Sequence, residues 1–269
     1  MTRETLSDQQ PSTFKCISPG IINMSQTQTL RASEHQNDGR PHVLLACTGS
    51  VATIKIPLII EALSHHDISM RLILSSSASQ FLQGQSAEQP SVSSLLKIPN
   101  LEAVYTDEDE WSQPWTRGAD ILHIELRRWA DIMIMAPLSA NSLAKMVAGM
   151  ADSLVMSVVR AWDTTAMLDA RRPNLPSSLR TSTGKKPLLV APAMNTAMWA
   201  HPVTHKQAAV LEQEWGIDVG GWIRLIRPVE KELACGDTGG GAMREWKDIV
   251  TIIRGYLDVQ TSSITNISV

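Results

Sequence analysis

The segment Lys186–Trp199, KPLLVAPAMNTAMW, contains the pattern that decides the fold. It includes a short, continuously apolar run, Leu188–Ala191, which is typical of a strand buried on both faces of a sheet. An amide and two thioethers then follow within a few residues, in Met194, Asn195 and Met198. A core strand that ends in such side chains indicates a site beyond the end of the strand.

The same pattern of strand and polar loop recurs along the chain. The predicted strands, each with the loop that follows it, are His42–Cys47 with Thr48-Gly49-Ser50, Met70–Leu74 with Ser75-Ser76-Ser77, Asp131–Ala136 with Pro137-Leu138-Ser139-Ala140-Asn141, and Leu188–Ala191 with Pro192-Ala193-Met194-Asn195. Apolar residues follow at helical spacing in Val51–Leu63, where Pro57 is expected to bend the helix, and at about Thr204–Trp215. This alternation predicts an α/β fold, a single Rossmann-like (flavodoxin-like) domain with a parallel sheet covered by helices on both faces. In such sheets ligands bind beyond the carboxyl ends of the strands, so the loops are expected to face one site.

Composition divides the 269 residues into one domain and two tails. Residues 1–40 are rich in Ser, Thr, Gln and Asn without periodicity, which predicts a disordered N-terminal tail. The domain is expected to span 41–258, and residues 259–269 to form a polar C-terminal tail. Within the domain, residues 163–185 mix charge, Pro and Ser with few apolar residues, which predicts a surface insertion.

The bulk composition excludes several classes of protein. Hydrophobic residues make up 43% and charged residues 19% of the chain, which allows a sizeable core. A net charge of −3 gives no electrostatic basis for binding nucleic acid or an anionic membrane, and no apolar run approaches the ~18 residues of a membrane span. The N-terminus has neither the apolar core of a secretory signal nor the acid-poor composition of a transit peptide, so we expect a cytoplasmic protein. Scattered cysteines and ungrouped histidines predict no disulfide and no metal site.

The polar loops have the chemistry of an anion site. Thr48-Gly49-Ser50 offers backbone N–H groups at the start of a helix, and the hydroxyls of Ser75, Ser77 and Ser139 add donors. Plain turn chemistry is the alternative interpretation of the same residues. The chain has neither the G-x-G-x-x-G fingerprint nor a P-loop, which disfavours NAD and ATP and leaves a mononucleotide.

Two residues outside these loops are candidate reactive groups. His123 lies in LHIELRRWAD, the segment just before a predicted strand; alternatively it caps or packs on a short helix whose Glu and Arg are solvated. Cys235 lies beside four glycines within six residues, which favours a lid that orders over a ligand, although a flexible loop with an incidental thiol has the same composition. Cys47 is expected to be a small core residue.

Taken together, the motifs resemble one known family. TGSVATIK, LHIELRRWAD, APLSAN, VAPAMNTAMW and ACGDTGGGAM occur in order from about His42 to Met243. They are similar to the motifs of the homo-oligomeric flavin-containing cysteine decarboxylases, which include phosphopantothenoylcysteine decarboxylases, plant halotolerance flavoproteins and peptidyl-cysteine decarboxylases. The resemblance implies FMN at the sheet edge and decarboxylation of 4′-phosphopantothenoylcysteine to 4′-phosphopantetheine in coenzyme A biosynthesis. Oxidation of the thiol-bearing carbon to a thioaldehyde would provide the electron sink that loss of CO2 requires.

The resemblance also implies roles for individual residues. The residues expected to contact FMN are Gly49, Ser50, Val51, Ser75, Ser77, Phe81, Ser139, Ala140, Asn141, Ser142 and Ala193. Relatives often have Thr-Lys-Ser where this chain has Ser75-Ser76-Ser77. His123 corresponds to the catalytic base, Cys235 to a group on a flap that acts late, and Asn195 to the residue that holds the substrate carboxylate. Arg128, Met198 and Ala234 would lie near the substrate, and Met198 and Trp199 would shape the pocket.

The family also suggests an assembly and rival functions. Its members usually form trimers with active sites between subunits, so a homotrimer is expected, with a paralogue as an alternative partner. Inhibition of a Ser/Thr protein phosphatase is a rival function, but the short tail after Asp258 has no acidic residue, and His123, Asn195 and Cys235 are all present. A peptidyl-cysteine decarboxylase and a nucleotide-binding oxidoreductase are further alternatives.

Overall fold

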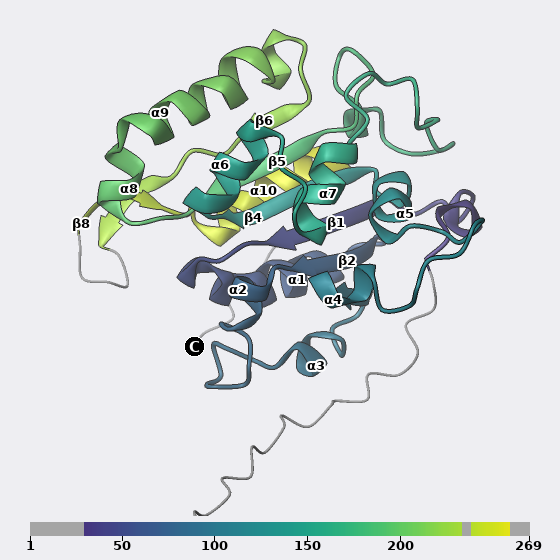
Figure 1. The fold of residues 1–269 in the computed structure, drawn as a ribbon, viewed down its shortest axis with the longest axis horizontal. Helices are drawn as coiled ribbons and strands as arrows, with labels where there is room; N and C mark the ends of the chain where they lie inside the picture. Colours follow the sequence, from purple (N-terminus) through teal and green to yellow (C-terminus); the bar gives the residue numbers. More distant parts are fainter. Residues whose placement is uncertain (1–29, 233–237, 259–269) are drawn as a thin grey trace, which may run out of the picture.

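A computed structural model of the chain describes residues 30–232 and 238–258. Its centre is a six-stranded sheet in the order β3-β2-β1-β4-β5-β6 (Figure 1), and every neighbouring pair is parallel. The strands are β1 His42–Cys47, β2 Ser69–Leu74, β3 Leu101–Tyr105, β4 Ile132–Leu138, β5 Leu188–Pro192 and β6 Ile223–Leu225. The strand order is that of the Rossmann sheet, whose direction of growth reverses between β1 and β4. The predicted fold class is confirmed.

The four strands found in the sequence are buried along their whole length. Alternate residues of β1 enter two different cores: Val43 and Leu45 pack on one face of the sheet, and Leu44 and Ala46 on the other. A strand with no solvated face has no polar alternation, so its apolar residues form a continuous run. Cys47 belongs to the first core, as predicted, and burial raises the pKa of its thiol.

Helices cover both faces of the sheet (Figure 1). The helices that contribute most to the cores are α1 Ile56–Ser64 and α10 Trp246–Leu257 against the first core, and α5 Leu122–Trp129, α6 Ala140–Ala148 and α7 Leu154–Ala161 against the second. The others are η1 Ala32–His35, η2 Val51–Lys55, α2 Ser76–Ser79, α3 Val92–Leu95, α4 Asp107–Glu110, η3 Ser177–Leu179, α8 Thr196–Ala200, α9 Pro202–Ala209, η4 Val210–Glu214 and η5 Ile217–Val219. Pro57 lies in the first turn of α1, so it begins that helix instead of bending it. No helix within the described ranges is long and apolar enough to cross a membrane.

Residues 30–40, which we expected in the N-terminal tail, pack on the domain. Leu30 and Ala32 are buried in the second core. The backbone N–H of Ala32 donates to Glu125 Oε2 at 2.8 Å, and Arg172 Nη2 donates to the carbonyl of His35 at 3.0 Å. The prediction of a tail up to residue 40 is therefore wrong for this part, because single contacts order it without any periodic pattern.

In the predicted insertion, residues 163–185, several polar side chains are buried and form hydrogen bonds within the protein. Asp163, Arg172 and Thr181 are buried. Arg172 Nη1 donates to Asp131 Oδ2 at 2.6 Å, and Trp162 at the base of the segment donates to the Lys186 carbonyl at 2.9 Å. A polar composition here reflects buried hydrogen bonding as well as exposure to solvent.

A two-stranded antiparallel sheet carries the glycine-rich motif: β7 Val229–Glu232 and β8 Thr238–Ala242. Gly239 and Gly241 have positive φ angles of 158° and 118°. A Cβ on Gly239 would lie 2.6 Å from Thr196 Cγ2, and one on Gly241 would lie 2.6 Å from the Met194 carbonyl. These glycines therefore allow β8 to lie directly against the start of α8.

Candidate functional site

A cavity of about 880 Å³ opens at the carboxyl edge of the sheet. It lies where the loops after β1 and β4 diverge, which is the switch point of this strand order. All eleven residues expected to contact FMN line it, and so do Asn195 and Met198. The loops after four different strands therefore converge on one site.

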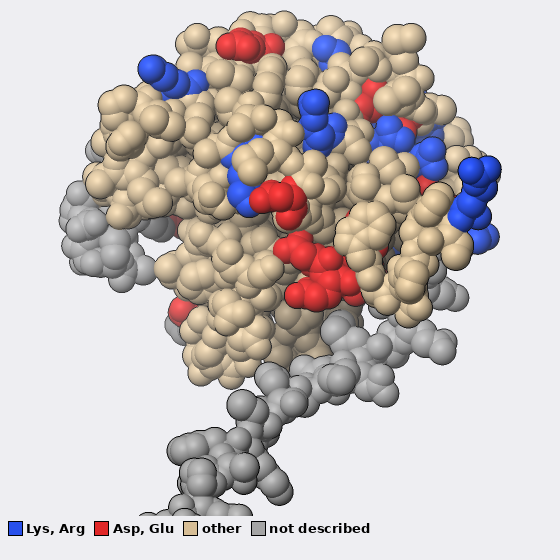
Figure 2. Space-filling view, in the orientation of Figure 1, with Lys and Arg blue, Asp and Glu red and all other residues tan. Residues whose placement is uncertain are grey.

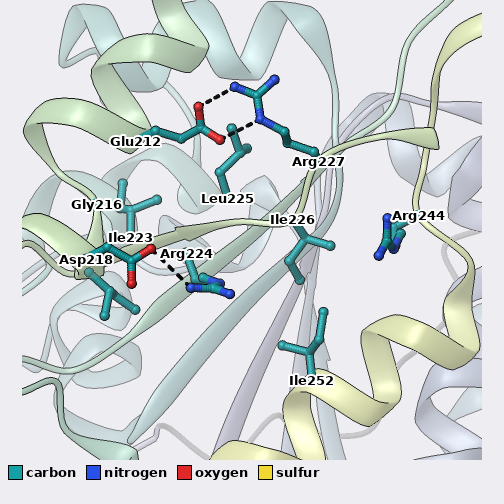
Figure 3. A pocket seen from close by; sticks show the side chains of 11 residues that line it. Glu212, Gly216, Asp218, Ile223, Arg224, Leu225, Ile226, Arg227, Arg244 and Ile252 are labelled. Carbon is teal, nitrogen blue, oxygen red and sulfur yellow. Dashed lines mark hydrogen bonds and ion pairs between the residues drawn. The ribbon is translucent and has the colours of Figure 1, made fainter. Parts of the chain in front are cut away.

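A second cavity, of about 400 Å³, lies beside β6 at the far edge of the sheet (Figure 3). Its three arginines are already paired: Arg227 with Glu212, Arg224 with Asp218 at 3.3 Å, and Arg244 with Asp248 at 3.0 Å. None of the predicted site residues lines it. The cavity at the switch point is the better candidate for the functional site.

The loop after β1 depends on a glycine and a threonine. A Cβ on Gly49 would lie 2.6 Å from Ser77 Cβ, so only glycine allows the loops after β1 and β2 to approach this closely. The Thr48 hydroxyl donates to the Pro137 carbonyl at 3.1 Å and accepts from the backbone N–H of Ser139 at 2.7 Å. These bonds join the β1 and β4 loops on either side of the switch point.

Serine side chains cap the helices around the cavity. Ser75 Oγ accepts from the N–H of Ala78 at 3.2 Å, and Ser139 Oγ accepts from the N–H of Ser142 at 3.2 Å. Ser139 also donates its hydroxyl proton to Ser142 Oγ at 3.1 Å, so Ser139 is not the free donor that we expected. The start of α6 nevertheless faces the cavity and favours an anion there.

Asn195 is the N-cap of α8, since its Oδ1 accepts from the N–H of Met198 at 2.8 Å. Among the described residues, none accepts a hydrogen bond from its Nδ2, which leaves that donor for a ligand. We expected Trp199 to shape the pocket, but it does not line the cavity and packs against the second core instead. The N–H of Met194 donates to the Gly241 carbonyl at 2.9 Å, so β8 adjoins the Asn195 loop. Ala234 and Cys235 lie outside the described residues.

His123 lies on α5 and lines a neighbouring cavity of about 640 Å³. Its Nδ1 lies 2.6 Å from Glu110 Oε1, and its backbone N–H donates to Glu110 Oε2 at 3.2 Å. Asp107, Asp152 and Ser153 line both this cavity and the larger one, so the two adjoin. Within one chain, His123 and Asn195 therefore occupy separate compartments.

Arg128 lies apart from both of these cavities. Its side chain is 55% exposed and donates to Glu125 Oε1 at 2.8 Å. The other charged residues of α5 are not solvated as the alternative interpretation supposed: Glu125 and Arg127 are buried, and Arg127 pairs with Asp169 at 3.3 Å. The helix buries charge because the N-terminal segment and the insertion supply partners that are distant in sequence.

Glu110 and two lysines were missed by the sequence analysis. Glu110 meets His123 only because α4 and α5 come together in the fold, and nothing in their spacing indicates this contact. Lys55 and Lys145 line the larger cavity, and the latter pairs with Asp152 at its rim. Lys55 lies less than two helical turns after the loop Thr48-Gly49-Ser50. This short distance from a predicted anion site could have identified it in the sequence.

One group of ligand-type side chains does form, contrary to expectation. Atoms of His35, Asp38 and His42 lie within 4.8 Å of one another. Asp38 pairs with Arg172, and His42 Nε2 lies 2.7 Å from Asp38 Oδ2, while burial lowers the pKa of His42. Because the guanidinium already balances the carboxylate charge, we interpret the group as an ion-pair network.

Comparison with known proteins found similar chains over most of this sequence. A probable phosphopantothenoylcysteine decarboxylase of Arabidopsis thaliana is 41% identical over 222 residues, which cover 82% of this chain and 90% of the relative. The solved structure of a PPC decarboxylase mutant complexed with pantothenoylaminoethenethiol has a TM-score of 0.63 at 38% identity and covers 82% of this chain and 100% of that chain. The solved structure of the FMN binding protein AtHal3 has a TM-score of 0.61 at 38% identity and covers 82% of this chain and 99% of that chain. The Flavoprotein family model matches residues 31–258, which include every element around the cavity; the resemblance seen in the sequence is confirmed, and this chain belongs to the Flavoprotein family.

Proposed function

We propose that this chain is an FMN-dependent decarboxylase that converts 4′-phosphopantothenoylcysteine to 4′-phosphopantetheine in the cytoplasm, a step of coenzyme A biosynthesis. One observation carries the proposal: every residue that the family pattern assigns to FMN lines a single cavity, beside Asn195. Relatives that cover 82% of the chain are named for this decarboxylase.

The cavity fits the dimensions and chemistry of FMN. Its volume of about 880 Å³ lies within the range of ~300–1,000 Å³ typical of cofactor pockets. The contact that a Cβ on Gly49 would make with Ser77 shows that the loops after β1 and β2 pack tightly together at the wall of this cavity. The loop at Gly49–Val51 and the start of α6 suit the phosphate, and Ala193 suits the ring. When bound, FMN supplies a two-electron acceptor for the thiol-bearing carbon of the substrate and later returns those electrons.

The side chains of this chain then bind and orient the substrate. Asn195 Nδ2 donates to the substrate carboxylate while its Oδ1 remains on the N–H of Met198, so the helix cap fixes the direction of the amide. Met198 lines the same cavity and limits the space beside the carboxylate. His123 takes the thiol proton as general base, and Cys235 acts late in the reaction.

We further propose that the protein works as a homotrimer. His123 lines a different cavity from Asn195, and the two cavities share Asp107, Asp152 and Ser153 at their border. A neighbouring subunit can join them by presenting its own His123 to this Asn195. Arg128, exposed on the same helix, would reach the substrate in the same way.

The test is an assay of the purified protein with 4′-phosphopantothenoylcysteine, following CO2 release and the visible spectrum together. We expect a yellow protein that releases CO2 and forms 4′-phosphopantetheine. A peptide ending in cysteine is the matched substrate control, and CO2 release from that peptide alone would favour peptidyl-cysteine decarboxylation. A colourless protein that does not bind added FMN would contradict the proposal.

A further inference from the structure

Glu110 holds His123 by two contacts. Oε1 lies 2.6 Å from Nδ1 of the ring, and Oε2 accepts the backbone N–H of the same residue at 3.2 Å. The Glu110 side chain is 5% exposed, whereas the His123 side chain is 23% exposed. The carboxylate therefore lies behind the ring, and the ring retains an accessible edge.

Glu110 also differs from the other acids on its helix. The sequence of α4 is DEDE, and acidic side chains gather over α4 in Figure 2. Asp107 accepts from the N–H of Leu154 at 2.8 Å, and Asp109 caps α4 through the N–H of Thr106 at 2.6 Å. Glu108 is exposed. Among the described residues, Glu110 is the acid that contacts the His123 ring.

This contact determines which ring nitrogen carries the proton. An ionised carboxylate can only accept hydrogen bonds, so Nδ1 must carry a hydrogen and donate it to Oε1. In the neutral ring, Nε2 then has the lone pair and is the basic atom. The second contact, to the backbone N–H, fixes the carboxylate itself, so it cannot rotate away from the ring.

We propose that Glu110 is a positioning residue that keeps His123 in the tautomer with a basic Nε2; this proposal rests on the proposed function for the role of that base. In the reaction, the S–H bond of the substrate breaks and its proton moves to Nε2. Glu110 stays ionised, keeps the Nδ1 proton in its hydrogen bond and balances the charge of the imidazolium. The other charged groups that line the same cavity are Asp107, Asp152 and Arg160. Asp152 pairs with Lys145, away from the ring.

The first test is Glu110→Gln in the flavin-loaded protein. Glutamine has the same shape as glutamate, but only one of its two terminal atoms can accept a hydrogen bond. If its oxygen accepts from the backbone N–H of His123, its NH₂ group faces Nδ1 and must donate to it. We expect kcat to fall by about 10²–10⁴-fold, as when a buried carboxylate partner of a catalytic histidine is neutralised. KM and the flavin spectrum should change little. Glu108→Gln, on the same helix but exposed, is the matched control and should retain wild-type kcat.

The second test does not depend on turnover. In a ¹⁵N-histidine NMR spectrum, assigned by comparison with His123→Asn, the wild-type ring should carry its proton on Nδ1 when neutral. Glu110→Gln should shift it to Nε2, and Glu110→Asp should restore the Nδ1–H form in part. A wild-type ring protonated on Nε2, or an unchanged kcat in Glu110→Gln, would overturn the proposal. Absence of decarboxylation in the wild type would refute the proposed function alone, since the tautomer is measured separately.

Discussion

At the scale of single residues, the cavity depends on one side chain with a structural and a binding role, Asn195, and on one position where only glycine fits, Gly49. Asn195 caps α8 with one side-chain atom and leaves the other for a ligand. Gly49 has space for a hydrogen only, because Ser77 occupies the position that a methyl group would take. Conservative substitutions at both positions therefore separate function from folding.

Asn195→Asp should abolish decarboxylation and leave FMN bound. Aspartate caps a helix as well as asparagine does, so the start of α8 is preserved. The substitution removes the Nδ2 donor and places a negative charge against the substrate carboxylate. The flavin spectrum and CO2 release, measured on one preparation, check this prediction; normal turnover would refute the carboxylate role.

Gly49→Ala should weaken FMN binding, because relief of the contact with Ser77 would displace the loop that is proposed to hold the phosphate; the overpacking itself typically costs about 1–3 kcal/mol of stability. The added methyl group meets Ser77 Cβ at 2.6 Å. Gly255→Ala in α10 is the control, since a Cβ there has nothing within 4 Å. The control should bind FMN normally and gain up to about 1 kcal/mol of stability from helix propensity. Flavin fluorescence titration gives the FMN affinities of Gly49→Ala and Gly255→Ala. Equal affinities would contradict the proposed role of the Gly49 loop in FMN binding.

At the scale of elements, the insertion is held by a buried carboxylate. The Asp163 oxygens accept from the N–H groups of Thr165, Leu168 and Asp169 at 2.9–3.0 Å, and from the Thr165 hydroxyl at 2.7 Å. Burial alone raises the pKa of this carboxyl, but the hydrogen bonds outweigh burial and lower the pKa below the ordinary value of 3.8. The segment thus folds around a charge instead of an apolar cluster.

Asp163 should make the protein more sensitive to acid. Its folded-state pKa is below the unfolded value, so its contribution is complete above pH 3.8 and is lost as pH falls below that value. Asp163→Asn should cost about 1–3 kcal/mol at pH 7, because the amide group faces donors that need an acceptor. The difference in unfolding free energy between the wild type and Asp163→Asn, measured by denaturant unfolding, should become smaller as the pH is lowered towards 3. Glu88→Gln, at an exposed residue, should change stability by less than about 0.5 kcal/mol.

At the scale of the whole molecule, the sheet brings two adjoining cavities to one side. One contains Asn195 and the expected FMN contacts, and the other contains His123. Asp107, Asp152 and Ser153 line both cavities, so the two adjoin within one chain. In the proposed homotrimer, the assembly would bring His123 and Asn195 together, because the two residues would then meet across a subunit boundary.

Mixing two inactive variants tests this arrangement. His123→Asn and Asn195→Asp should each be inactive alone and regain activity when co-expressed, because some sites then combine an intact histidine with an intact asparagine from different subunits. With equal and random mixing, about one quarter of the sites should be intact. Mixed preparations without activity would show that both residues must act within the same chain.

The sequence alone predicted the strands that form the centre of the sheet and the loops at their ends. It missed β3 and β6 at the edges, where burial is only partial and the apolar run is interrupted. It also missed the packing of residues 30–40, which depends on partners about 90 or more positions away. Prediction succeeded where a short window of residues carries its own pattern.

The local sequence by itself indicated a parallel α/β sheet and the polar loops at one site, since continuous apolar runs and the loops after them are properties of neighbouring residues. The family resemblance added the individual FMN contacts. Only the tertiary structure decided that Glu110 lies behind His123, that Gly239 and Gly241 press against α8, and that His123 and Asn195 occupy different cavities. These contacts join elements whose spacing along the chain has no period, so they follow from packing of the whole fold.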